Sequence, residues 1–276
     1  MNIRIGHSPD PDDAFLFYAL TKGKLTYPGI TFTHCLEGIE DLNQRAFSAE
    51  LEMTAISLHA YPYCADRYIL LPTGASVGDG YGPVVVATEP LSLEDLRKMP
   101  IAIPGRFTTA ALLLQLALGL VKFQVMPFDQ ILPAVRDRKI GAGILIHEGQ
   151  LTYGEAGLKK ILDLGEWWKG QTHLPVPLGV NVLRRDVGPD LLKRLAGAFK
   201  ESLDYSFAHR EEALAYAQQF GRGLNISLTD RFVGMYVNRW SIECRPDGAY
   251  AMQQLLDWAA REKITPRRVS IEFVEG

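Results

Sequence analysis

Short apolar segments typical of β-strands alternate with helical segments from the first residues of this chain. Strands are predicted at residues 3–7, 30–34 and 53–58, with helices at 14–25 and 39–47 between them. A second run has strands at 83–87, 101–103, 123–126 and 143–147, with helices beginning at 92, 110 and 128. Strands that are separated by helices favour a parallel sheet with helices on its faces. The predicted fold class is therefore α/β.

The second run lies inside the chain, because another strand is predicted at 179–183 and a mostly helical region follows from Asp190. This order predicts a two-lobed clamshell, with a larger discontinuous lobe of residues 1–87 and 184–276 and a smaller inserted lobe of residues 88–183. The hinge is expected near 84–88 and 179–183. Residues 72–82, rich in Gly and Ser, are expected to form an exposed loop. Ligand sites prefer such domain interfaces, and hinge closure would exclude water.

Composition narrows the class of protein. The 276 residues are 47% hydrophobic and 22% charged, which suits a packed globular core. A net charge of -3 does not suit a general nucleic-acid binder. Cys35, Cys64 and Cys244 lack the spacing of a disulfide framework or a zinc site, so free thiols in a reducing compartment are expected.

No membrane association is expected either. The apolar stretch at 110–121 is interrupted by Gln115 and is too short to span a bilayer. The first strand begins so early that no signal peptide is expected before it. These features predict a cytoplasmic protein, and the oligomeric state is left open.

The loop after the first strand carries three carboxyl groups. Asp10 is predicted to cap the first helix, with Pro11 at its first position and Asp13 reaching back. Ser8 and the free helix amides would then face the region beyond the strand end, where ligands bind in open α/β folds. Asp10, Asp12 and Asp13 could also gather a cation, but capping explains two of them more simply, so no metal is predicted.

A similar strand–loop–helix segment lies in the second run. Thr108 and Thr109 open a helix directly after Gly105 and Arg106. The glycine would let the backbone approach a ligand, and the helix N-terminus would attract a carboxylate or phosphate, with Arg106 adding a bidentate contact. An ordinary threonine N-cap would explain the same residues without a ligand.

His147 is the best candidate for acid–base chemistry. It follows a very apolar strand, and the ordinary imidazole pKa near ~6.5 suits proton transfer at neutral pH. A structural histidine at a strand end is the alternative. Ser57 at the end of the third strand and Asn43 in the preceding helix are polar cleft candidates, or else local turn and cap contacts.

Several of these segments together carry a family resemblance. The chain resembles the 1,4-dihydroxy-6-naphthoate synthases of the futalosine route to menaquinone, and the similar segments follow the same order over most of its length. They are residues 8–20, 41–43, 66–68, 82–87, 104–110, 146–148 and 162–168.

The resemblance implies a type II periplasmic-binding-protein fold and a lyase reaction. Cyclic dehypoxanthinyl futalosine, a small carboxylated substrate, would be converted in the interlobe cleft to 1,4-dihydroxy-6-naphthoate, with loss of a sugar-derived fragment and without a cofactor. His147 would be the catalytic base. Ser57, Thr108 and Thr109 would contact the substrate, with Asn43 and the Ser8 loop nearby.

The chain departs from the family pattern in its first loop. Asp10, Asp12 and Ala14 stand where the family usually has cysteine, asparagine and threonine. A carboxylate that faces an anionic substrate at ~4 Å would repel it by about 1 kcal/mol in water and by more in a closed cleft. A paralogue with a related substrate is therefore one possible interpretation.

Two other functions remain open at this point. A chorismate dehydratase would share the fold and also take a carboxylated ligand, but segments 104–110 and 146–148 match the naphthoate synthases better. A non-catalytic solute-binding protein would need an export signal or a lipid anchor, and neither is recognised in this sequence.

Overall fold

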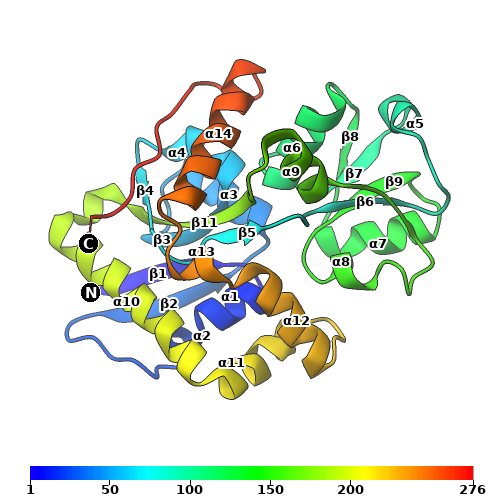
Figure 1. The fold of residues 1–276 in the computed structure, drawn as a ribbon. Helices are drawn as coiled ribbons and strands as arrows, with labels where there is room; N and C mark the ends of the chain where they lie inside the picture. Colours follow the sequence, from blue (N-terminus) through cyan, green and yellow to red (C-terminus); the bar gives the residue numbers. More distant parts are fainter. Residues whose placement is uncertain (276) are drawn as a thin grey trace.

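The computed structural model describes residues 1–275, which form two α/β lobes side by side (Figure 1). The strands of the first lobe are β1 (Asn2–His7), β2 (Thr31–Leu36), β3 (Met53–Ser57), β4 (Tyr68–Leu70), β5 (Ser76–Gly78) and β11 (Val176–Arg184). Its helices are α1 (Pro11–Leu16), α2 (Tyr18–Thr21), α3 (Ile39–Phe47), α4 (Tyr61–Cys64), α10 (Pro189–Ala208), α11 (Arg210–Ala217), α12 (Ile226–Tyr236), α13 (Arg239–Ile242) and α14 (Asp247–Arg261). Short 3₁₀ turns lie at η1 (Leu58–Ala60), η2 (Arg185–Val187) and η3 (Gln218–Phe220).

The second lobe is smaller and lies between β5 and β11 in the chain. Its strands are β6 (Val84–Ala87), β7 (Ile101–Ile103), β8 (Phe123–Val125), β9 (Ala142–Leu145) and β10 (Lys159–Asp163). Its helices are α5 (Leu93–Lys98), α6 (Thr109–Leu118), α7 (Phe128–Arg136), α8 (Gly149–Thr152) and α9 (Leu164–Thr172). The two-lobed α/β class that the alternating pattern predicts is confirmed.

Each lobe is built on one sheet with helices on both faces. The first sheet has the order β2-β1-β3-β11-β4, with β5 also paired to β11, and the second has the order β10-β6-β9-β7-β8. In the first lobe α3, α4 and α14 cover one face, and α1, α10 and α11 cover the other (Figure 1). Every residue of β3 is buried because it lies between these layers. Its apolar sequence, Met-Thr-Ala-Ile-Ser with a single threonine inside, matches that position.

Both sheets are mixed rather than parallel. The predicted parallel pairs of β1 with β2 and β3 are present, but β11 runs antiparallel to β3, β4 and β5. In the second sheet β6 runs antiparallel to β9 and β10. These two strands enter their sheets from the other lobe rather than through a crossover helix, so nothing local requires them to run parallel.

The prediction of an exposed loop at residues 72–82 is wrong. The segment contains β5, and Ala75 and Val77 are fully enclosed in the core between β11 and the C-terminal helices. Strand β10 was not predicted, because its first residues, Lys159 and Lys160, are exposed on the edge of the sheet. An edge strand of this kind lacks the apolar run of a central strand.

The two strands expected at the hinge are each paired inside a single sheet. Val84–Ala87 lies between β9 and β10 in the second sheet, and Gly179–Leu183 lies beside β3 in the first. If each strand is assigned to the lobe whose sheet it belongs to, the chain crosses from the first lobe to the second within residues 79–83 and returns within residues 164–175. Both crossings lie a few residues earlier in the chain than expected. Tertiary pairing rather than local sequence decides this boundary.

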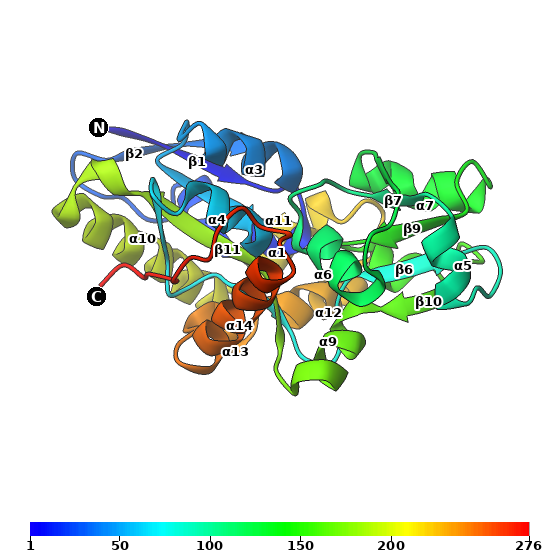
Figure 2. The same cartoon turned by 90° about the horizontal axis from the view of Figure 1, so that it is seen from above.

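The lobes are closed on each other. One hydrophobic cluster runs through both, and Trp168 of α9 packs 5.8 Å from Trp258 of α14, between ring centroids. Figure 2 shows the two lobes in contact along α6, α9 and α12. Within residues 1–275, no helix is both long enough and apolar enough to cross a membrane.

Polar contacts also join the lobes. Arg222, before α12, donates from Nη1 to Glu148 Oε1 at 3.0 Å and from Nη2 to the Pro9 carbonyl at 2.7 Å. The guanidinium also lies 4.4 Å from the centre of the Phe128 ring. Glu148 and Phe128 belong to the second lobe and Pro9 to the first, so Arg222 fastens the two lobes together.

Replacing Arg222 with methionine should loosen this closed arrangement. Glu148 is only 11% exposed, and without its partner it keeps a buried charge, so we expect a loss of about 1–3 kcal/mol in unfolding free energy. The radius of gyration from small-angle X-ray scattering should increase as the lobes separate. Arg245→Met is the control, because its pair with Glu243 lies inside one lobe. Equal effects from both variants would contradict the assignment.

Candidate active site between the lobes

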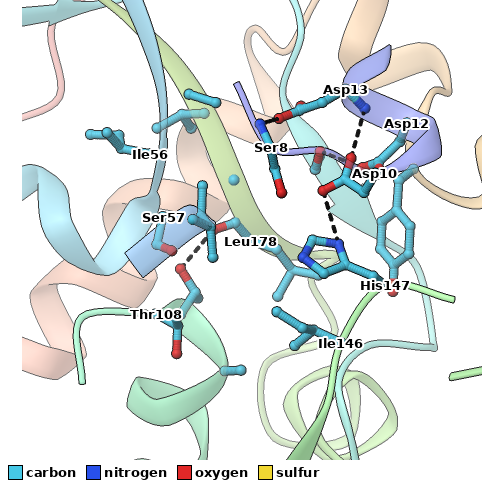
Figure 3. A pocket seen from close by; sticks show the side chains of 18 of the residues that line it. Ser8, Asp10, Asp12, Asp13, Ile56, Ser57, Thr108, Ile146, His147 and Leu178 are labelled. Carbon is cyan, nitrogen blue, oxygen red and sulfur yellow. Dashed lines mark hydrogen bonds and ion pairs between the residues drawn. The ribbon is translucent and has the colours of Figure 1, made fainter. Parts of the chain in front are cut away.

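A pocket lies between the lobes where the ends of β1, β3 and β9 meet the start of α6 (Figure 3). It is the cleft that the clamshell prediction anticipated. Most of the predicted site residues line it, together with residues that sequence analysis did not select. The polar residues that line it are Ser8, Asp10, Asp12, Asp13, Ser57, Ser76, Thr108, Thr109, His147, Gln150, Asn181 and Tyr236.

The loop between β1 and α1 is held by its own carboxyl groups. Asp10 Oδ1 accepts a hydrogen bond from the Asp13 amide at 3.0 Å, and Pro11 is the first residue of the helix, as predicted. Asp13 reaches back further than expected, because its Oδ2 accepts from the Ser8 amide at 2.7 Å. Ser8 Oγ is buried in the pocket with no hydrogen-bond partner among the described residues. The loop therefore holds a free hydroxyl in the cleft.

His147 lies on the opposite wall and points at this loop. Its Nδ1 is 3.1 Å from Asp10 Oδ2 (Figure 3). The Phe128 ring packs against the imidazole in a T-shaped arrangement, with 4.7 Å between the ring centroids. Its Nε2 is buried and has no hydrogen-bond partner in residues 1–275. The backbone at His147 is left-handed, with φ of 54°, which non-glycine residues seldom adopt and which is common at functional sites.

The three carboxyl groups of the loop have different proton affinities. Burial favours the neutral form of Asp10, but the His147 ring and hydrogen bonding, including the bond from the Asp13 amide, outweigh it and lower the pKa of Asp10. Burial and the charge of Asp10 raise the pKa of Asp12 and of Asp13 well above the usual carboxyl value. The loop therefore favours one ionised carboxylate, that of Asp10 beside the imidazole.

Hydroxyl groups form the other end of the pocket. Thr108 Oγ1 donates to the Gly105 carbonyl at 2.8 Å and caps α6 by accepting from the Ala111 amide at 3.3 Å. Thr109 Oγ1 donates to the Leu178 carbonyl at 2.6 Å, which ties α6 to β11. Thr108 and Thr109 line the pocket while serving these structural bonds; that they bind a ligand stays a prediction.

Ser57 lines the pocket, and Asn43 stands behind it. Asn43 Oδ1 accepts from the Ser57 amide at 2.8 Å, and Asn43 Nδ2 lies 3.2 Å from Ser57 Oγ. Asn43 is fully buried and is not among the residues that line the pocket. Its place is to orient Ser57.

The amides just before the Thr108 cap of α6 are occupied by a carboxylate of the protein. Glu40 of α3 accepts from the Arg106 amide at 3.1 Å and from the Phe107 amide at 3.0 Å. A Cβ at Gly105 would lie 2.3 Å from Glu40 Oε2, so the glycine admits this side chain rather than a ligand. Arg106 is exposed and does not line the pocket.

Sequence analysis missed the residues that reach the pocket from distant elements. Asn181 of β11 places an unpartnered Oδ1 in it, and the hydroxyl of Tyr236 of α12 lies 2.6 Å from the Gln150 side chain of α8. No local signal marks them, because each belongs to an ordinary strand or helix pattern. Among the described residues, no arginine or lysine lines the pocket.

Three residues could offer ligand atoms to a metal. Atoms of Asp10, Asp12 and His147 lie within 4.8 Å of one another. However, Asp10 uses one oxygen for the α1 cap and the other for His147, whose Nδ1 is engaged in the same contact. A hydrogen-bonded pair accounts for these atoms, and we assign no metal to them.

Replacing Asp12 with asparagine should change how stability depends on pH. Because the pKa of Asp12 is raised, the folded chain binds this proton more tightly than the unfolded chain. Its contribution to the unfolding free energy is therefore greatest at low pH and falls above about pH 4, by at most about 1.4 kcal/mol per pH unit. The lowered pKa of Asp10 acts in the opposite direction, and below that range.

Urea unfolding at a series of pH values measures this effect. Asp12→Asn should remove part of the decline in stability with rising pH, whereas Asp190→Asn, at an exposed position, should leave it in place. Parallel curves for Asp12→Asn and the unmodified protein would show that Asp12 ionises freely in the folded state.

Comparisons with known proteins agree with this architecture. Residues 3–261 match the family model for menaquinone biosynthesis. The chain is 42% identical over 255 residues to a 1,4-dihydroxy-6-naphthoate synthase of Thermus thermophilus, covering 92% of each protein. It is 36% identical over 275 residues to a protein of the same name from Streptomyces coelicolor, covering 96% of this chain and 95% of that protein.

Solved structures show the same fold. A crystal structure of a protein from Archaeoglobus fulgidus has a TM-score of 0.91 and 46% identity, and the match covers 95% of this chain and 98% of that one. The alkanesulfonate-binding protein of Xanthomonas axonopodis has a TM-score of 0.71 at 14% identity. This match covers 98% of this chain and 96% of that protein. The latter likeness confirms the periplasmic-binding-protein-like clamshell. The chain belongs to the menaquinone biosynthesis family and is a homologue of the 1,4-dihydroxy-6-naphthoate synthases.

Proposed function

We propose that this protein is a cytoplasmic lyase that converts cyclic dehypoxanthinyl futalosine to 1,4-dihydroxy-6-naphthoate without a cofactor. The observation that carries the proposal is the imidazole of His147, whose free Nε2 is buried at the wall of the interlobe pocket. The names of the two relatives, each matched over more than nine-tenths of its length, give the product, and the family resemblance implies the substrate.

His147 acts as the base in this proposal. A base that removes the proton of a hydroxyl group β to a carbonyl allows retro-aldol cleavage: the oxygen forms a new carbonyl, the carbon–carbon bond breaks, and its electron pair becomes an enolate. Aromatisation of the new ring drives the reaction forward. Proton transfer by a positioned side chain contributes typically about 10²–10⁴-fold to a rate. The closed lobes support this chemistry, because they exclude water from the developing carbanion.

The charge distribution of the pocket orients the substrate. The carboxyl groups of Asp10, Asp12 and Asp13 lie at one end, and the hydroxyls of Ser57 and Thr108 lie at the other. A substrate carboxylate at ~4 Å from an ionised aspartate would be repelled by about 4 kcal/mol at an effective dielectric constant of 20. We therefore place the substrate carboxylate at the hydroxyl end, beside the N-terminus of α6, and the reacting carbon near His147.

The alternatives have less support. The relatives that match over nearly the whole chain are both named naphthoate synthases, which does not favour a chorismate dehydratase. The binding protein matches at 14% identity, which shows a shared fold and no shared ligand.

Incubation of the purified protein with cyclic dehypoxanthinyl futalosine should yield 1,4-dihydroxy-6-naphthoate, detected by mass spectrometry, whereas chorismate should remain unchanged. His147→Asn should lower kcat by at least about 10²-fold, because an amide cannot accept the proton. Asparagine is chosen because it tolerates the left-handed backbone at this position.

The matched control for this variant is His173→Asn. His173 also has a positive φ, of 61°, but it is exposed at the end of α9 and outside the pocket. Its kcat should equal that of the unmodified protein. Near-normal turnover by His147→Asn would exclude the base assignment, and turnover of chorismate alone would exclude the substrate.

A further inference from the structure

We propose that Asp10 is a positioning residue, which accepts a hydrogen bond from His147 Nδ1–H across the cleft and so holds Nε2 as the basic atom facing the pocket. This inference rests on the proposed role of His147 as the base. It assigns a function to a buried carboxylate of the first lobe that the proposed reaction does not otherwise use.

The geometry of the pair selects one form of the imidazole. A neutral imidazole carries its proton on only one nitrogen, and the hydrogen bond made by the other nitrogen decides which. Asp10 Oδ2 lies 3.1 Å from Nδ1 and, as a carboxylate oxygen, only accepts hydrogen bonds. The ring proton is therefore placed on Nδ1. Nε2 keeps its lone pair, and it is the ring atom left without a partner in the described structure.

The carboxylate is itself held in place. Its Oδ1 accepts from the Asp13 amide at the N-terminus of α1, and the Asp10 side chain is only 2% exposed. Rotation of the side chain would break the helix cap, so Oδ2 has a single direction available. On the other side, the Phe128 ring packs against the imidazole. Each partner is thus oriented by contacts within its own lobe.

The pair exists only when the lobes are together. Asp10 belongs to the first lobe and His147 follows β9 of the second. Their chain neighbours Pro9 and Glu148 are both bound by Arg222, so the contact that fastens the lobes lies beside the pair. An open form would leave the imidazole without its acceptor. Closure of the lobes on a substrate therefore also brings His147 Nδ1 into contact with Asp10, which leaves Nε2 as the basic atom.

Asp10→Asn separates this role from the helix cap. The asparagine Oδ1 still accepts from the Asp13 amide, but its Nδ2 faces His147 Nδ1 and donates to it. The imidazole proton should then move to Nε2, the atom that has to be basic. In the serine protease triad the corresponding substitution lowers kcat by about 10⁴-fold for this reason. We expect a fall of about 10²–10⁴-fold here, with KM within threefold of the unmodified value.

The form of the ring can be observed directly. Proton–nitrogen correlation spectra of histidine-labelled protein distinguish Nδ1–H from Nε2–H, and the His147 signals are those missing from His147→Asn. The unmodified protein should show Nδ1–H, and Asp10→Asn should show Nε2–H. Asp10→Ser is the second variant, since serine caps a helix but does not reach the imidazole. Its circular dichroism spectrum should match that of the unmodified protein, and its kcat should fall at least tenfold.

Three results would overturn the positioning role. They are an Nδ1–H ring in Asp10→Asn, an Nε2–H ring in the unmodified protein, and a kcat within threefold of the unmodified value in Asp10→Asn or Asp10→Ser. The spectra need no substrate, so they test the pair even if the futalosine assay fails. Failure of the unmodified protein in that assay alone would overturn the proposed reaction, and the spectra would still decide the contact between Asp10 and His147.

Discussion

A buried carboxylate and an imidazole that meet across the cleft hold the site together. Asp10 caps the helix that follows β1, His147 follows β9 of the other lobe, and their contact of 3.1 Å requires closed lobes. Two buried polar groups of this kind would be unfavourable apart, because each would lose its hydration without a partner. The helix cap below Asp10 and the Arg222 contacts beside the pair both stabilise the arrangement in which they meet.

The first loop shows how a strongly acidic sequence can suit an anionic substrate. Three aspartates in four residues suggest strong repulsion, but each has a different task. Asp13 binds the Ser8 amide, Asp10 faces the imidazole, and the raised pKa of Asp12 favours its neutral form. The negative charge next to the pocket is therefore smaller than the sequence suggests. It is concentrated at Asp10, beside the imidazole of His147, the proposed base.

Sequence reasoning succeeded where the controlling interactions are local. The cap at Asp10, the extent of α3 and α7, and the position of His147 at a strand end follow from residues close together in the chain. The predictions were wrong where the structure depends on contacts between segments that are far apart in the chain. The buried strand β5 and the antiparallel entry of β11 depend on pairing between the first sheet and a strand a hundred residues later, and the left-handed backbone of His147 leaves no mark in composition.

Glu40 shows that local sequence also does not reveal which group binds to a loop. A carboxylate was predicted at the N-terminus of α6, and one does bind just before it, at the amides of residues 106 and 107, but it comes from Glu40 of α3 in the other lobe. Local sequence identifies the kind of group that a loop attracts, whereas the fold decides whether a ligand or a side chain supplies it. This position lies outside the pocket, so it is separate from the place proposed for the substrate carboxylate, beside the Ser57 hydroxyl and the N-terminus of α6. Hydrogen bonds between a carboxylate and backbone amides, which bind ligands in other proteins, here join the two lobes. The polar atoms without a partner in the pocket belong to Ser8, Asn181 and His147.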